Sequence, residues 1–202
     1  MTKAGDRYYN NLSDKTDANI YAKAFYQINT KLGAYVDLQF RNVDFDSDGI
    51  FEAQQKAQFG NSYIFFNPKL GLNYKIKPNT YAYISYAIGN KEPARQDFVN
   101  SLGLRLPKAE HLQDVEIGLK QKSDNSFVEV DAYFMNYTNQ LVITGQINNV
   151  GEAIRTNVAK SYRAGLEIQG GIQINNNLKL AANVTISKNK IKKKKRWCIL
   201  YS

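Results

Sequence analysis

The sequence predicts an all-β chain, an antiparallel transmembrane β-barrel segment of about eight strands. Three observations support this prediction. Apolar and polar residues alternate along successive runs, which places them on opposite faces of strands. The connections between the runs are short and long in turn, as in outer-membrane barrels. No run approaches the ~18 consecutive apolar residues of a helical membrane span, which agrees with a mean hydropathy of −0.49.

The first two predicted strands are residues 20–28 and 34–41, and the polar residues before them (6–17) are expected to form a turn-rich segment. In the second strand Leu38 lies on the apolar face, whereas Arg41 lies on the opposite, polar face. A charged side chain would be costly in a dry core. The polar face is therefore expected to line a wet lumen, and the apolar face to meet lipid.

The clearest hairpin follows, with predicted strands at residues 66–76 and 82–89. In each strand alternate residues are apolar and the residues between them are mostly polar. The turn between them (77–79) contains Pro78, which lacks an N–H, and Asn79, which favours turns. This hairpin could belong to a soluble sheet that covers a core, or it could span a membrane. The number of such hairpins in the chain, and the lengths of the connections between them, distinguish the two.

The unit recurs twice more. Short turns at 123–126 and 175–177 join the strands within each of these hairpins. The four strands are residues 114–120, 128–135, 162–169 and 178–187.

The connections between these strands alternate strictly in length. The short ones are 29–32, 77–79, 123–126 and 175–177, and the long ones are 43–63, 89–108 and 139–157. Outer-membrane barrels have short periplasmic turns and long extracellular loops. Residues 77–79 are therefore predicted to lie in the periplasm and residues 89–108 outside the cell. Residues 43–63 are expected to contain strand extensions on either side of Asp48 and Gly49.

The chain is expected to contain two parts, a partial outer-membrane barrel (1–191) and a basic tail outside it (192–202). The tail reads KKKKRWCILYS and breaks the alternation without a turn. Because adenine-rich codons encode lysine, we interpret it as the scar of a frameshift in an adenine tract; the alternative is a genuine basic tail. No apolar segment of a signal peptide follows Met1.

The net charge of +9 does not indicate a nucleic-acid-binding protein. Seven basic residues fall within the last fifteen positions, and without them 20 basic and 18 acidic residues remain. No basic stripe is left to follow a phosphate backbone. The single cysteine, Cys198, excludes an intrachain disulfide.

Three segments together resemble the TonB-dependent outer-membrane receptor family. NTYAYISYAIGNKEP (79–93) resembles a strand that leads into an extracellular loop, and LPKAEHLQDVEIGLKQKSDNSFVEVDAYFMNYTNQLV (106–142) is similar to the hairpin that follows. NVAKSYRAGLEIQGGI (157–172) resembles the next strand, with Ala159 where glycine is usual.

The resemblance implies part of a 22-strand barrel in the outer membrane of a Gram-negative bacterium. The family's barrel is filled by a plug domain and imports a scarce ligand such as a ferric siderophore. The inner-membrane TonB complex supplies the energy through a short N-terminal segment. The plug and that segment have no counterpart in this sequence, so we expect a truncated fragment that is not competent for transport by itself.

Ligand contacts are expected from the long loops. The candidates are Lys91, Glu92, Arg95, Gln96, Arg105 and Lys108. Arg105 and Lys108 could pair with an anionic siderophore, although each of the six is also an ordinary solvated loop residue.

No catalytic residue, cofactor or metal site is predicted, and the chain is not expected to be an enzyme. The run from Asp44 to Gly49 has the start of a calcium loop, but Gln55 stands where a glutamate ligand is needed. His111 has no partner at ligand or triad spacing.

Three alternatives remain open at this stage. The first is a passive pore or structural barrel, the second an inactive gene fragment, and the third a soluble β-sheet binding protein. A membrane-barrel segment of eight strands would have two unpaired edges, so the isolated chain is expected to aggregate.

Overall fold

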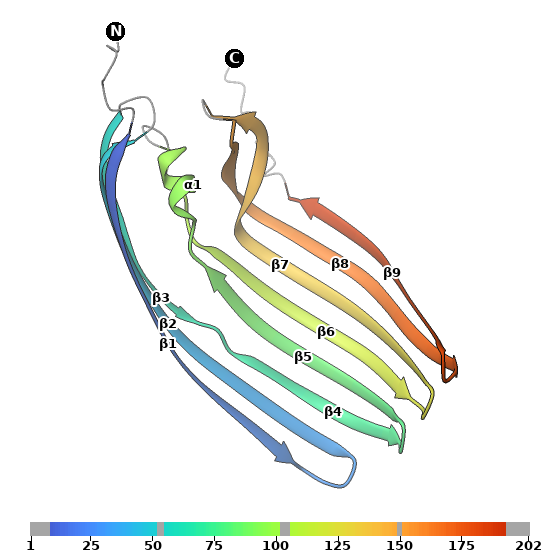
Figure 1. Cartoon of the computed structure of the whole chain (residues 1–202). Helices are drawn as coiled ribbons and strands as arrows, with labels where there is room; N and C mark the ends of the chain where they lie inside the picture. The colour runs from blue at the N-terminus through green and yellow to red at the C-terminus, as the bar shows by residue number, and fades with distance from the viewer. Residues whose placement is uncertain (1–8, 52–54, 102–105, 149–150, 193–202) are drawn as a thin grey trace, which may run out of the picture.

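The computed structural model describes residues 9–51, 55–101, 106–148 and 151–192 as one antiparallel sheet with a short helix (Figure 1). The elements are β1 (Asn10–Gln27), β2 (Leu32–Phe51), β3 (Gln55–Phe66), β4 (Lys69–Lys77), β5 (Thr80–Lys91), α1 (Arg95–Val99), β6 (Glu110–Lys122), β7 (Ser126–Ile147), β8 (Ala153–Asn175) and β9 (Leu178–Ile191).

The nine strand segments occupy eight positions across the sheet. The order is β1-β2-β4-β5-β6-β7-β8-β9, and β3 pairs with β2 alone. Phe66 of β3 lies opposite Phe40 of β2, and Lys69 of β4 lies opposite Asp37, so the same register continues through both segments. β3 and β4 are therefore one strand interrupted at Pro68, and the prediction of about eight antiparallel strands is confirmed.

One face of this sheet carries a band of exposed apolar side chains. In β9 the band runs from Leu178 to Ile186, about the 9–11 residues that a tilted strand needs to cross the hydrocarbon core. An exposed apolar surface of this extent is typical of a lipid-facing wall. Representative members are Val36, Leu38, Phe40, Leu70, Leu72, Ile84, Ile117, Val128, Phe134, Ile168, Val184 and Ile186. We call this face the outward face and the opposite one the inner face.

The inner face is polar, and tyrosines lie over glycines of the adjacent strand. A Cβ added at Gly71 would lie 2.7 Å from Cζ of Tyr35, and one added at Gly118 would lie 2.7 Å from Cζ of Tyr83. The hydroxyl of Tyr83 also donates a hydrogen bond to Asp131. These glycines give the rings room to lie along the wall.

Several strands are longer than the sequence predicted, because the polar ends of the hairpins are also paired. Residues 10–17, expected to be turn-rich, belong to β1. The expected extensions of residues 43–63 are present, but they do not divide at Asp48 and Gly49. These two residues lie within β2, which continues to Phe51, and β3 begins at Gln55. Residues 139–157 are mostly the outer ends of β7 and β8.

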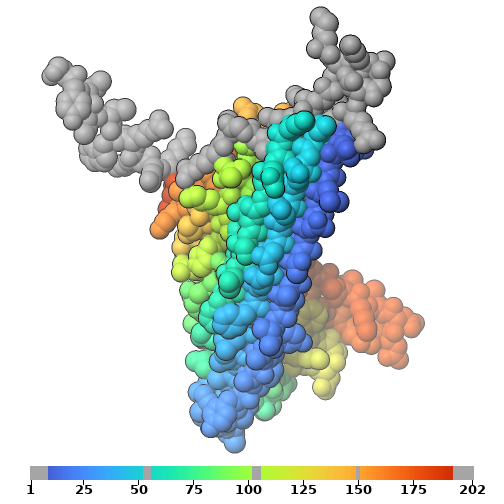
Figure 2. Space-filling view, turned by 90° about the vertical axis from the view of Figure 1, so that its left-hand side faces the viewer, coloured from blue at the N-terminus to red at the C-terminus, as the bar shows by residue number. Residues whose placement is uncertain are grey.

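The segment 89–108 is the long connection that remains, and it contains an unexpected helix, α1. β1 and β2 run along most of the height of the described sheet, and β3 lies beside the upper part of β2 (Figure 2). β9 ends at Ile191, and the predicted tail, except for Lys192, lies outside the described residues.

A substitution at Gly118 tests the tyrosine–glycine packing. In Gly118→Ala the added Cβ would collide with the Asp131 carboxylate and with the Tyr83 ring that bonds it, so both side chains have to shift. We expect a destabilisation of about 1–3 kcal/mol. The measurement is the amount of folded chain in the outer-membrane fraction. Gly89→Ala is the control, because a Cβ there has no heavy atom closer than 3.9 Å. Equal yields of the two variants would contradict the packing role.

Candidate functional site: an inward-folded loop at the barrel mouth

The connection between β5 and β6 lies on the inner face, between the outer ends of β1–β3 and those of β7–β8 (Figure 1). Pro93 is buried where the chain leaves β5. The carboxylate of Asp97 accepts a hydrogen bond of 2.9 Å from the N–H of Ala94, which fixes the first turn of α1. Asn100 ends the helix. We call residues 92–101 the mouth loop.

An apolar cluster fastens the mouth loop to β2 and β3. Phe98 of α1 is fully buried and stacks on Phe59 at 5.6 Å between ring centroids. Phe51 lies 5.1 Å from Phe59, and Phe45 lies 5.0 Å from Phe98. Aromatic pairs at these distances stabilise a structure beyond the area they bury. Val99 completes the cluster.

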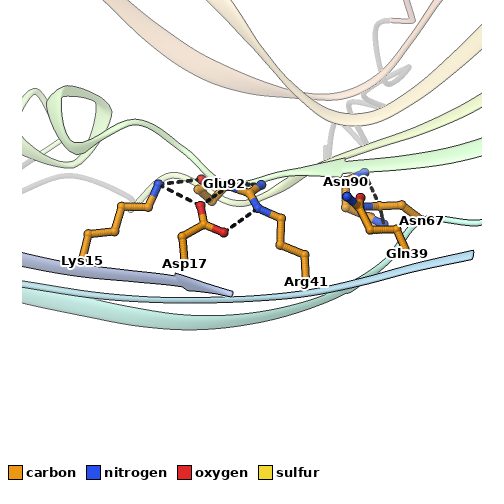
Figure 3. A network of polar contacts seen from close by, with 7 residues as sticks. All are labelled: Lys15, Asp17, Gln39, Arg41, Asn67, Asn90 and Glu92. Atoms are coloured by element: carbon orange, nitrogen blue, oxygen red, sulfur yellow. Dashed lines mark hydrogen bonds and ion pairs between the residues drawn. The ribbon is translucent and has the colours of Figure 1, made fainter. Parts of the chain in front are cut away.

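A charged network fastens the same loop to β1 and β2 (Figure 3). The Arg41 guanidinium donates two hydrogen bonds to Asp17, of 2.9 and 2.6 Å, and two to Glu92, both of 2.9 Å. Lys15 donates to Glu92 at 3.0 Å and lies 3.7 Å from Asp17. The side chain of Glu92 is only 12% exposed, and that of Arg41 23%. Bidentate pairing of this kind fixes geometry as well as charge.

The network also sets the protonation of Glu92. Burial by itself would raise the pKa of this carboxyl. Hydrogen bonds from its own backbone N–H, Lys15 and Arg41, with the charge of Arg41, outweigh that effect and hold the pKa of Glu92 below its ordinary value. Glu92 is therefore ionised at neutral pH and remains paired.

On its other side the mouth loop contacts β7 and β8. Asp97 lies 3.8 Å from Arg155, and Asn148 donates a hydrogen bond of 3.0 Å to Asn100. The mouth loop thus bridges the wall from β1–β3 to the β7–β8 end. An open cavity of about 320 Å³ remains between the loop and β1–β2, and it contains Lys15, Lys91 and Arg95 among its lining residues.

The six predicted ligand contacts fall into different environments. Lys91 is exposed at the end of β5. Glu92 belongs to the network, and Arg95 donates to Asn11 at 3.1 Å and lies 5.8 Å above the Phe51 ring. Gln96 donates to Asn100 at 3.3 Å.

Lys108 is exposed, and its backbone N–H and C=O both bond the Asn157 side chain, at 2.7 and 3.0 Å. Arg105 lies outside the described residues. Sequence reasoning missed Lys15, Asp17 and Arg41 as partners of Glu92. The alternation placed Arg41 on the polar face of its strand. Residues 15 and 17 were assigned to a turn-rich segment, so no pattern in the sequence placed them on the same face as Arg41.

Metal sites, the lone histidine and helical membrane spans are the other possibilities within the described residues. The described part of the chain has no group of three or more His, Cys, Asp or Glu placed to hold a metal ion. The Asp44–Gly49 run lies within β2, so its carboxylates do not converge as in a calcium loop. His111 contacts Asn90 at 2.8 Å. No helix among the described residues is long and apolar enough to cross a membrane.

An apolar outward face, a polar inner face and an inward-folded outer loop define the wall of an outer-membrane barrel. The family described as "TonB dependent receptor-like, beta-barrel" matches residues 2–196. The chain belongs to this family of outer-membrane receptors and transporters, and the sequence-based identification is confirmed. No curated protein matches the sequence.

Solved receptor structures share the fold. The ferric citrate transporter FecA in its unliganded form has a TM-score of 0.71 and 14% identity, over 95% of this chain and 29% of its own. The copper transporter OprC has a TM-score of 0.72 and 12% identity, over 89% and 30%. The ferric-catecholate import receptor Fiu from E. coli K12, closed form, has a TM-score of 0.68 and 18% identity, over 92% and 29%. The chain thus spans less than a third of each of these structures.

Removal of the Glu92 charge should loosen the mouth loop. We expect Glu92→Gln to speed hydrogen exchange at the amides of Asn100 and Ser101 roughly 5- to 30-fold, which corresponds to about 1–2 kcal/mol for a partly buried pair. Lys23→Gln is the matched control, because it breaks a 2.9 Å ion pair with Asp37 between the same two strands. If both variants exchange alike, the network does not hold the loop.

Acid should have the same effect as this substitution. Because the pKa of Glu92 is lowered in the folded chain, its contribution to stability is complete above the ordinary value of 4.5 and is lost as the pH falls through the lowered value. Exchange at the same two amides, corrected for intrinsic rates, should be constant above about pH 5 and rise as the pH falls from there toward about pH 3. The Glu92→Gln variant should lack this rise; an identical rise in the variant would assign it to another group.

Proposed function

We propose that the chain forms part of the wall and mouth of a receptor that imports a scarce ligand, such as a ferric siderophore, across the outer membrane. The family match over residues 2–196 carries this proposal. Two of the structural neighbours are named for ferric ligands, ferric citrate and a ferric catecholate. We propose no catalytic role for the chain.

The charges around the mouth loop favour an anionic ligand. Lys15, Lys91 and Arg95 line its cavity together with Glu92. Asp14 also borders the cavity, although its position in β1 belongs to the outward face. Glu92 is neutralised by Arg41 and Lys15, so the groups left for a ligand are mainly cationic. We therefore assign Lys91 and Arg95 to ligand contact and Glu92 to positioning of the loop. Gln96 and Lys108 remain candidates, and so does Arg105, which lies outside the described residues.

The described sheet ends in two edge strands, β1 and β9, that do not pair with each other. It therefore does not enclose a channel by itself. We propose that import requires further strands to complete the wall, a plug, and coupling to the TonB complex through segments outside this sequence.

Uptake in cells tests the proposal. Cells with the reading frame intact or deleted are grown under iron limitation and given radioactive iron as a ferric siderophore. Deletion should reduce uptake to background, and dissipation of the proton-motive force should do the same in the intact strain. Undiminished uptake after deletion would contradict the proposal. Uptake that depends on the frame but not on the proton-motive force would indicate a passive pore.

A further inference from the structure

The outer boundary of the apolar band is sharp on β8 and β9. Along β9 the outward positions are apolar through Ile186, and the next outward residues are Lys188 and Lys190. On β8 the last residues of the band are Ala164 and Tyr162. The ring of Tyr162 stacks with that of Phe134 at 5.9 Å, as aromatic residues do at a membrane–water interface.

Four lysines gather just beyond this boundary on the outward face. The strand register places Lys188 opposite Ala164 and Lys190 opposite Tyr162. Lys192 donates its N–H to the carbonyl of Lys160 at 2.9 Å, which brings these two residues together in the next row. We call Lys160, Lys188, Lys190 and Lys192 the lysine patch.

Among the described residues the lysine patch has no acidic partner. In the described residues none of its members takes part in an ion pair. The outward residues of the adjacent strand β7 at this height are Asn136 and Thr138, which are uncharged. Lys192 lies 5.6 Å above the Tyr162 ring. All four lysines are exposed.

The positive charge is local to this part of the rim. Beyond the same boundary on β1 and β2 the outward residues include Asp14, Asp44 and Asp46. Between the two regions the outward residues include the amides Gln113 and Asn136, which bond each other at 3.2 Å, and the pair His111 and Thr138. A general solvation role would not require like charges to gather at one place, since they repel one another.

We propose that the lysine patch binds the phosphate groups of lipids in the outer leaflet. The strand ends that carry it lie on the side of the long connection, which is the extracellular side. Lysine ammonium groups bind phosphates as point charges, and long lysine side chains near a membrane surface extend to the headgroups while their methylenes contact apolar atoms. Each lysine close to an anionic surface strengthens binding about 5-fold.

Lipid binding by the full chain, extracted from outer membranes in mild detergent, tests this proposal. Native mass spectrometry would follow titration with lipid A, which bears phosphates on its glucosamine headgroup, or with the same lipid after dephosphorylation. We expect lipid A to bind wild type and Lys188→Arg/Lys190→Arg alike, and Lys188→Gln/Lys190→Gln about 10- to 30-fold more weakly. The dephosphorylated lipid should bind all three equally weakly.

Lys75→Gln/Lys179→Gln is the matched control, because it removes the same charge from the inner face near the opposite end of the strands. This control should bind lipid A as wild type does. Equal weakening by the control, retained affinity in Lys188→Gln/Lys190→Gln, or equal binding of the dephosphorylated lipid would each overturn the proposal. Loss of binding in the arginine variant would show misfolding or a requirement other than charge, and would overturn it too.

Discussion

Backbone hydrogen bonding within the lipid is the constraint on which this structure depends. A peptide group without a partner costs several kcal/mol in hydrocarbon, so the strands have to pair continuously across the apolar band. The one proline in the spanning region of the described strands, Pro68, shows how this constraint is met. It lies between Phe66 and Leu70, two apolar residues of the same face, and its carbonyl accepts a hydrogen bond of 2.9 Å from Ile88. Proline has no N–H, so the interruption leaves no unpaired donor at this position.

The same constraint explains which parts of the fold were predictable. Inside the band every second side chain faces lipid and has to be apolar. Strands such as 178–187 can therefore be recognised from alternation alone. Beyond the band both faces of a hairpin meet water, and alternation is no longer required. The outer ends of β2, β7 and β8 therefore resemble loops in sequence although they belong to paired strands, with a register shift between Ile143 and Ile147 in β7. Helix α1 has five residues and no apolar period long enough to detect.

The candidate site was predictable only in part for a related reason. Lys91, Glu92 and Arg95 were found because they follow the last apolar residue of their strand. The partners of Glu92 come from 51 and 77 residues away in sequence, Arg41 and Lys15. Only the register between β1 and β2 places those two side chains beside the mouth loop. The charge of Glu92, which the sequence suggested for ligand binding, is therefore paired within the protein, whereas Lys91 remains exposed.

The interruption at Pro68 has a consequence for the shape of the rim. Below it, β4 joins β2 to β5, and the wall is continuous. Above it, β3 stays with β2 while β5 turns toward the mouth loop, so the wall divides into two leaves. Phe98 and Glu92 close the seam between the leaves, one by packing and the other by charge. At the mouth the two leaves are thus joined by side-chain contacts, including the hydrogen bond of 2.9 Å from Asn90 to Asn67, and not by strand pairing.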